Sequence, residues 1–155
     1  MRVHPLPQGG LAIQLESTEE WPILSGILRD ARMPGFNAAG QVGCKMTGAT
    51  DRQDWAEFVL PDLREGFEHH LKTVLKAIET ARFEAAGGPG AVVISGAESF
   101  DWYASLNQAR LALEARYQFS AGLPGDSRAP EQQAALYRTQ FYCAIQSLLL
   151  DLGLE

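Results

Sequence analysis

The sequence contains few cysteines, few basic residues and no long apolar run, and each shortage argues against a class of protein. Only two of the 155 residues are cysteines, and Cys44 and Cys143 form neither a CxxC motif nor a disulfide framework. A reducing, cytoplasmic location is therefore expected. No stretch approaches the roughly 18 apolar residues of a membrane span, and the N-terminal segment lacks the pattern of a secretory signal. Neither membrane insertion nor export is expected.

Basic side chains are outnumbered by acidic ones, 13 against 19, which gives a formal net charge of −6. A negative protein repels phosphate backbones and anionic lipid surfaces at long range, and no run of Lys and Arg marks a basic patch. The last two predicted helices are also too long and too far apart for a tight helix-turn-helix. We therefore expect no nucleic-acid or membrane partner. A basic patch assembled by the fold is the minor alternative, because net charge does not fix its own distribution.

What is present is the composition of a folded globular protein, with 46% hydrophobic and 21% charged residues. A chain of this length buries roughly 70% of the surface that it exposes when unfolded. We therefore expect a single domain over residues 1–155, with a core that requires neither disulfides nor a metal.

Short β-favouring segments occur at the N-terminus. Residues 2–7 and 11–15 are separated by Gln8, Gly9 and Gly10, and the two glycines permit the positive φ of a tight turn. This pattern predicts a small hairpin over residues 2–15, which is too short to be stable unless it packs on helices. A brief β-branched run at residues 91–94 is a candidate for a third short strand.

The rest of the chain predicts about five helices. Capping boxes at Ser17 with Glu20 and at Ser95 with Glu98 mark two helix starts, and Pro61 suits the first turn of another. The expected helices are residues 18–32, a short piece at about 51–60, a long helix from 61 to the glycines at 87–90, a fourth after the Ser95 box, and a last from near Pro130. The predicted fold class is mainly α (α+β), a compact helical bundle with a small N-terminal β-hairpin.

Residues 33–51 are glycine-rich and too long for a simple connector. They predict a flexible loop or a binding loop. Cys44 lies within it, but its only charged sequence neighbour is Lys45, which is weak support for an activated nucleophile.

The adjacent pair His69 and His70 suggests a metal or acid–base site at first sight. Neighbouring helical positions point about 100° apart, so the two imidazoles cannot share one metal from a single helix face. We therefore predict no metal site and no cofactor, and we keep His69 only as a polar candidate for ligand binding.

Asn107 and Arg110 lie one turn apart among bulky apolar residues of the fourth helix. The structural interpretation is that Asn107 bonds a loop backbone and Arg110 pairs with a carboxylate or with helix-end carbonyls. The functional alternative is that the pair forms an anion-recognising fork in a cleft. No phosphate-binding loop or nucleophile elbow occurs, so no catalytic residue is assigned.

The fourth helix also carries a family resemblance. Its pattern Trp102-x-x-x-Leu106-Asn107-x-x-Arg110-Leu111-x-Leu113 resembles the W-x-x-x-LN-x-x-RL-x-L signature of the DUF2017 family of uncharacterised bacterial proteins. Residues 11–20 and 136–149 are also similar to that family. The chain departs from the pattern at Glu114, where the family often has glycine, and in the 35–48 loop.

The resemblance implies a context rather than a mechanism. Some family members are encoded beside the gene for the Clp protease adaptor, and some carry the label of transcriptional regulator. We therefore expect a non-enzymatic interaction or regulatory protein, linked by this context to Clp-dependent proteolysis, with a protein partner or self-association. Self-association is the simplest form, and the run Leu148-Leu149-Leu150 is a candidate face for it. The alternative is a small-ligand-binding protein or enzyme that uses the 33–51 loop and a helical cleft with Asn107, Arg110 or His69. The sequence does not identify a small molecule.

Overall fold

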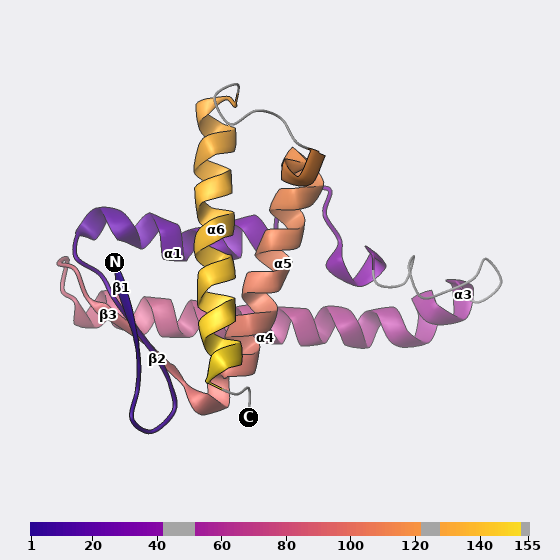
Figure 1. Cartoon of the computed structure of the whole chain (residues 1–155). Coiled ribbons are helices and arrows are strands. Elements are labelled where there is room, and N and C mark those ends of the chain that lie inside the picture. The colour runs from indigo at the N-terminus through magenta and orange to yellow at the C-terminus, as the bar shows by residue number, and fades with distance from the viewer. Residues whose placement is uncertain (42–51, 122–127, 153–155) are drawn as a thin grey trace.

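A computed structural model describes residues 1–41, 52–121 and 128–152 (Figure 1). The elements in chain order are β1 (Arg2–Pro5), β2 (Gly10–Gln14), α1 (Trp21–Ala31), α3 (Arg52–Asp54), α4 (Leu60–Glu84), β3 (Ala91–Ser95), α5 (Ser99–Tyr117) and α6 (Pro130–Asp151). The predicted class, mainly α with a small β part, is confirmed. None of the helices in these described ranges is both long enough and apolar enough to cross a membrane.

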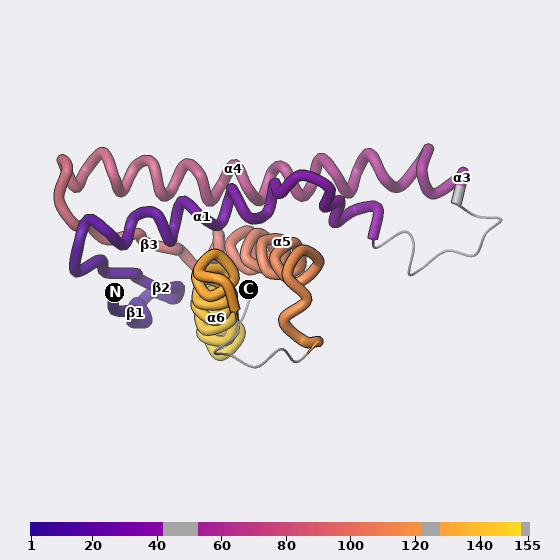
Figure 2. Tube along the Cα trace, turned by 90° about the horizontal axis from the view of Figure 1, so that it is seen from above, coloured from indigo at the N-terminus to yellow at the C-terminus, as the bar shows by residue number. Residues whose placement is uncertain are grey.

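The helices form two crossing pairs. Helices α1 and α4 run alongside each other, and α5 and α6 cross them, as the two views in Figures 1 and 2 show. Helix α5 contacts α1, α4 and α6, so it is the central helix of the bundle. The small sheet lies at the end of the bundle where α1 begins and α4 ends.

The N-terminal hairpin and the third strand are both confirmed. The sheet has the order β1-β2-β3 with antiparallel pairing throughout, and Ala12 of β2 lies opposite His4 and Val93. Gly9 and Gly10 both have a φ of 89°, as the turn requires. A Cβ at Gly10 would lie 2.1 Å from the carbonyl oxygen of Ile94, so this position also needs glycine for the close approach of β3.

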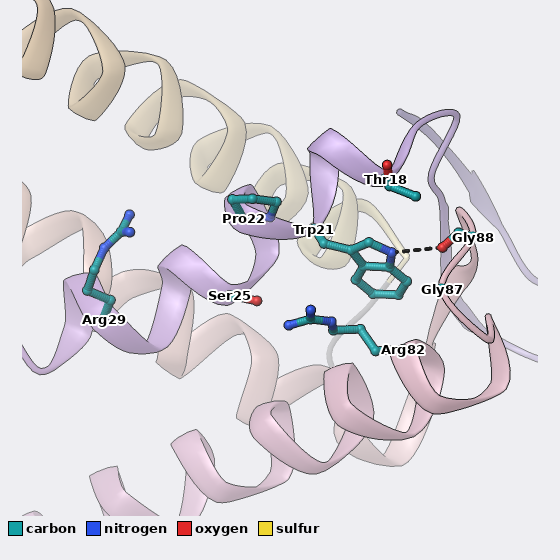
Figure 3. Close-up of a pocket in the computed structure, with 8 residues that line it drawn as sticks. All are labelled: Thr18, Trp21, Pro22, Ser25, Arg29, Arg82, Gly87 and Gly88. Carbon is teal, nitrogen blue, oxygen red and sulfur yellow. Dashed lines mark hydrogen bonds between the residues drawn. The ribbon is translucent and has the colours of Figure 1, made fainter.

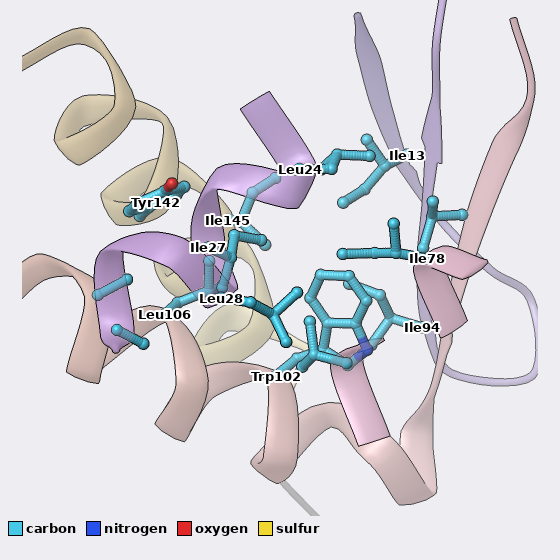
Figure 4. Close-up of a cluster of buried hydrophobic side chains, with 14 of the residues drawn as sticks. Ile13, Leu24, Ile27, Leu28, Ile78, Ile94, Trp102, Leu106, Tyr142 and Ile145 are labelled. Atoms are coloured by element: carbon cyan, nitrogen blue, oxygen red, sulfur yellow. The ribbon is translucent and has the colours of Figure 1, made fainter. Parts of the chain in front are cut away.

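The core fills the angle between the sheet and the helices, around the fully buried Trp102 of α5 (Figure 4). Leu106, Ala109 and Leu113 continue the buried face of α5 at helical spacing. The other buried apolar side chains of this core come from both partners, the sheet and the helices: Leu11, Ile13, Val92, Ile94, Leu24, Ile27, Leu71, Val74, Ile78, Tyr142 and Ile145.

Both predicted capping boxes are present. The Glu20 carboxylate accepts hydrogen bonds from the backbone N–H groups of Glu16 at 2.7 Å and Ser17 at 3.4 Å, while Ser17 Oγ accepts one from Glu19 N–H at 3.0 Å. The Ser95 box is closed in the same way by Glu98. A short 3₁₀ turn follows each box before the α-helix proper begins.

The predicted helix start at Pro61 is confirmed to within one residue, because α4 begins at Leu60 and has Pro61 in its first turn. The prediction missed only that the short piece before it is continuous with α4. Residues Arg52 to Glu84 form one helical run in which a π-helical turn, Trp55–Val59, joins α3 to α4. Proline has no N–H, and its ring clashes with the carbonyl four residues earlier in a regular α-helix. The widened turn, in which Leu60 N–H donates to the carbonyl of Trp55, accommodates Pro61 without ending the helix.

The predicted 33–51 loop is only partly within the described residues. Residues 38–41 form a helical turn, and Asn37 Oδ1 accepts a hydrogen bond from Gly40 N–H at 3.0 Å at its start. Residues 42–51, which include Cys44, lie outside the description, so the prediction for them stays a prediction.

Candidate functional site

Arg110, the first predicted ligand-binding residue, is part of a polar connection between two helices. Its Nη1 donates to Gln146 Oε1 of α6, and Gln146 Nε2 in turn donates to the backbone carbonyl of Tyr103 at 3.1 Å. The partner is therefore an amide rather than the expected carboxylate or helix-end carbonyl. Because Gln146 is buried and neutral, it accepts from Arg110 without adding a second charge to the interior. The contact supports the structural interpretation of Arg110.

Asn107 and His69 do not join Arg110 in a common site. Asn107 is half-buried, and no hydrogen bond within the described residues involves its side chain. His69 is exposed, whereas its neighbour His70 contacts α5, with Nδ1 2.6 Å from Asp101 Oδ1. None of these predicted ligand-binding residues lines the clefts described below.

A buried charge cluster that the sequence did not reveal joins α1 to α6. Asp30, 1% exposed, accepts two hydrogen bonds from Arg138, at 2.7 and 3.1 Å, and one from Tyr142 Oη at 2.9 Å. Burial lowers the pKa of Arg138, but the hydrogen bond and charge of Asp30 outweigh it and raise that pKa. The sequence carried one sign of this cluster: Asp30 follows Ile27 by three residues, which places its carboxylate on the apolar face of α1. The carboxylate is fully engaged, so this cluster is structural.

One cleft lies between α1 and the end of α4, and we call it the Trp21 cleft (Figure 3). It encloses about 680 Å³ and is lined by Thr18, Trp21, Pro22, Ser25, Arg29, Arg82, Gly87 and Gly88. Trp21 is fixed there because its indole N–H donates to the carbonyl of Gly88 at 3.1 Å. The Arg82 guanidinium carbon lies 5.9 Å from the centre of the Trp21 ring, a cation–π distance.

A second cleft lies where the 33–51 segment begins. It encloses about 340 Å³ and is lined by residues of α1, α4 and α5 together with Phe36, Asn37 and Ala39. The side chain of Gln108 reaches this cleft, and its buried Nε2 has no hydrogen-bond partner among the described residues. The sequence analysis chose Asn107 and missed Gln108, because helix periodicity alone does not show which neighbour faces a cleft.

A third cleft runs along the outer edge of the sheet, and we call it the edge cleft. It encloses about 310 Å³ between α4 and β3 and is lined by Lys76, Ala77, Thr80, Ala81, Glu84, Ala91, Val93 and Glu98. The strand order β1-β2-β3 leaves β3 without a neighbouring strand on this side.

The backbone of β3 is unpaired toward the edge cleft. Leu15 N–H donates to the carbonyl of Gly90 at 2.8 Å, and bonded pairs alternate along an antiparallel ladder. The register therefore makes Val92 and Ile94 the positions bonded to β2, while Ala91 and Val93 direct their N–H and C=O groups away from it. No hydrogen bond within the described residues uses the backbone groups of Ala91 or Val93.

The two edges of the sheet differ in how they are protected. Pro5 lies at the end of β1 and removes a donor, and Arg2 adds a charge, both of which discourage pairing with another strand. Strand β3, with the sequence AVVIS, has no proline and no charge, and Val93 is 53% exposed. Helix α4 flanks this edge across the edge cleft, but β3 itself carries neither of the two devices found on β1, and an apolar edge strand is a template for another strand.

The described ranges hold a histidine–carboxylate pair of the kind that acid–base chemistry uses, but they hold no candidate metal site. They contain no group of three or more His, Cys, Asp or Glu side chains placed to hold a metal ion. The His70–Asp101 pair joins α4 to α5 and stands against the Phe100 ring, 5.3 Å away between centroids.

The fold and its surfaces define a class: a small, mainly helical protein whose three-stranded antiparallel sheet ends in a strand, β3, that faces α4 across an open cleft. A family model, Domain of unknown function (DUF2017), matches residues 45–152. The match spans more than half of the chain, which belongs to this family, as the Trp102 to Leu113 signature predicted. The match does not extend to β1, β2 and α1, so the predicted similarity of residues 11–20 is not part of it. No curated protein and no solved structure matches the chain.

Proposed function

We propose that the protein is a non-enzymatic interaction module that pairs with a second copy of itself through the β3 edge. The observation that carries this proposal is the unused backbone of Ala91 and Val93 beside an open cleft. Two copies of β3 placed antiparallel around a two-fold axis, with Val93 opposite Val93, would satisfy these groups mutually and extend the sheet across both molecules.

Helix α4 supplies the side chains that support this pairing. Lys76, Thr80 and Phe83 occupy one face of α4 at helical spacing, next to the edge cleft. Phe83 is 87% exposed, which is unusual for an aromatic side chain of a monomer, and Ala77 and Thr80 are small enough to let another helix approach. A five-residue strand alone gives a weak interface, so these contacts are the second part of the proposed surface.

The charges of the edge cleft match a second copy. Lys76 and Glu84 lie two helical turns apart at opposite ends of the cleft. Under a two-fold axis the Lys76 end of one molecule meets the Glu84 end of the other, and the same contact occurs twice. Glu98, the third charged side chain of the cleft, already accepts hydrogen bonds from Ser95, so Lys76 and Glu84 are the charges that remain for this self-complementary contact.

The alternative face predicted from the sequence is less suitable. Leu149 is 1% exposed and belongs to the core, while Leu148 and Leu150 are exposed about 200° apart around α6. The run of three leucines therefore does not form one apolar face, in contrast to the continuous edge of β3.

The test is the oligomeric state measured by sedimentation velocity across the micromolar range. Val93→Lys places a charge on the strand edge and is expected to give a monomer that keeps the wild-type helical circular dichroism. Leu150→Lys is the matched control, because Leu150 is also 53% exposed, and it should leave the dimer intact. A wild-type protein that stays monomeric at high micromolar concentration contradicts the proposal, as does a dimer lost in Leu150→Lys but kept in Val93→Lys.

A charge exchange tests the two-fold arrangement itself. Lys76→Glu and Glu84→Lys should each weaken the dimer by about five-fold, because each places like charges at both ends of the interface. The double variant restores opposite charges in exchanged positions and should return toward the wild-type dissociation constant. Additive loss in the double variant would rule out the proposed orientation.

The second candidate function is small-ligand binding at the cleft that begins the 33–51 segment. The buried and unpartnered Nε2 of Gln108 favours it, because an unsatisfied buried donor costs free energy unless a ligand or water accepts its hydrogen bond. Screening a metabolite library by thermal shift on the wild type and on Gln108→Leu would test it. A hit that stabilises both proteins equally would argue against this cleft. The link to Clp-dependent proteolysis rests on family context and stays a prediction.

A further inference from the structure

We infer that the Trp21 cleft binds a small molecule that carries a phosphate group. The protein has a net charge of −6, yet this cleft is lined by two arginines and by no acidic side chain. The fold thus assembles a local positive site that is not apparent in the sequence, since Arg29 and Arg82 are 53 residues apart.

The position of Arg82 leaves its N–H donors free to bind a ligand. Its guanidinium lies over the Trp21 ring, and the described residues provide it with no carboxylate partner. Figure 3 shows the side chain extending from α4 past Trp21 toward Ser25. Stacking on an aromatic face leaves the N–H donors at the edge of the guanidinium free for an oxyanion.

Arg29 contributes a second charge from the opposite wall. Its Nε lies 3.7 Å from Asp30 Oδ1, beyond ordinary hydrogen-bond range. The Asp30 carboxylate accepts hydrogen bonds from Arg138 and Tyr142 and none from Arg29, so among the described residues the Arg29 N–H donors stay free for a ligand. The Arg29 side chain is 64% exposed and can turn toward a ligand.

The donors of the cleft fit a phosphate better than a carboxylate. Two guanidinium groups are accompanied by the hydroxyls of Thr18 and Ser25, neither of which makes a side-chain hydrogen bond within the described residues. A phosphate monoester carries a charge near −2 with three strong acceptor oxygens, whereas a carboxylate carries −1 with two. The guanidinium of Arg82 and the hydroxyl of Ser25 can therefore hold the phosphate, and Arg29, one turn from Ser25 on α1, supplies a second positive charge that matches it.

The size and the walls of the cleft indicate more than an inorganic ion. About 680 Å³ is in the range of sites that hold whole small molecules. Trp21 and Pro22 provide apolar surface beside the arginines, so an organic group attached to the phosphate has a place to pack.

This site is independent of the proposed dimer. Arg82 follows Thr80 of the edge cleft by two residues, which places them about 200° apart around α4. The proposed phosphate site and the proposed dimer surface therefore lie on opposite sides of one helix, so an experiment can refute either proposal without affecting the other.

The experiment is isothermal titration of the full chain with phenyl phosphate, inorganic phosphate, benzoate and phenol at fixed ionic strength. Phenyl phosphate is expected to bind about ten-fold more tightly than inorganic phosphate because of the apolar wall. Benzoate should bind more weakly than phenyl phosphate, and phenol should not bind. Benzoate that binds as tightly as phenyl phosphate, or no saturable binding of phenyl phosphate up to tens of millimolar, would overturn the inference.

Variants separate the cleft from diffuse attraction. Arg82→Gln should weaken the binding of phenyl phosphate by at least about ten-fold. Arg82→Lys should weaken it by less, because lysine keeps the positive charge but lacks the planar guanidinium. Lys72→Gln is the matched control, because Lys72 is an exposed cation of the same helix about 15 Å away and lines none of the clefts described above. An equal loss in Lys72→Gln would show nonspecific attraction and refute the site. If Arg82→Gln does not fold, Ser25→Ala offers a milder second variant and should still weaken binding measurably.

Discussion

Arg138 of α6 donates two hydrogen bonds to Asp30 of α1, across 108 residues of sequence, and Tyr142 completes the shell of that carboxylate. A buried carboxylate with three donors around it is stabilised only as a set. We expect Asp30→Ala to lower the free energy of unfolding by about 3 to 5 kcal/mol, because it leaves Arg138 uncompensated and Tyr142 without an acceptor. Urea denaturation measures this loss.

The control for Asp30 is an exposed pair that uses the same kind of groups. Arg116 Nη2 lies 3.7 Å from the exposed Glu131. Arg116→Ala should therefore change the free energy of unfolding by less than about 1 kcal/mol. If both substitutions cost the same, the Asp30 cluster does not have the structural role assigned to it.

The elements of this fold could largely be predicted from the sequence, because helix stripes, caps and turn glycines are local features. The capping boxes at Ser17 and Ser95 and the glycines at 9 and 10 each correspond to the predicted structure. The start of α4 near Pro61 was also predicted, but the π-helical turn that joins α4 to α3 was not, because the sequence does not show where a helix can widen by one residue.

The surfaces could not be predicted, because they depend on which distant segments meet. Nothing in the local pattern of β3 indicates that it pairs with β2 and remains at the edge. In the same way, Trp21 and Arg82 form one cleft only because α1 and α4 run together. The most distinctive sequence pattern, Asn107 with Arg110, pointed to a ligand site, whereas the structure gives Arg110 an internal contact.

The internal role assigned to Arg110 makes a prediction. Arg110→Ala removes the donor that bonds Gln146 Oε1, and this buried amide oxygen is left without a hydrogen bond. We therefore expect the free energy of unfolding to fall by about 1 to 3 kcal/mol. The dimer constant and the affinity for phenyl phosphate should remain at wild-type values when the folded protein is tested. A selective loss of ligand binding without loss of stability would instead make Arg110 a binding residue.

Glu114, the departure from the family signature, closes the C-terminal end of α5. Its carboxylate accepts hydrogen bonds from Ser120 Oγ and, at 3.1 Å, from Ser120 N–H, and the Ser120 hydroxyl is the main cause that lowers the pKa of Glu114. A carboxyl whose folded-state pKa is lowered stabilises the protein above its unfolded pKa and loses this effect as the pH falls through the folded value. The melting temperature of Glu114→Gln should therefore lie below that of the wild type at neutral pH, and the difference should vanish in strong acid. A difference that grows on acidification would contradict this assignment.

Gly9 and Gly10 offer a paired test of how the sheet is held together. Both have a φ of 89°, but a Cβ at Gly9 would meet nothing within 4 Å, whereas one at Gly10 would lie 2.1 Å from the Ile94 carbonyl oxygen. Gly9→Ala should cost only the backbone strain of a left-handed conformation, about 1 to 2 kcal/mol. Gly10→Ala adds a clash that forces β2 away from β3, so it should lower the free energy of unfolding clearly more than Gly9→Ala does.

Because the β3 edge keeps its position through β2, Gly10→Ala should also weaken the dimer, while Gly9→Ala should not. Chemical denaturation and sedimentation of the two variants check both expectations, and equal behaviour of the pair would show that the β2–β3 contact does not set the geometry of the edge.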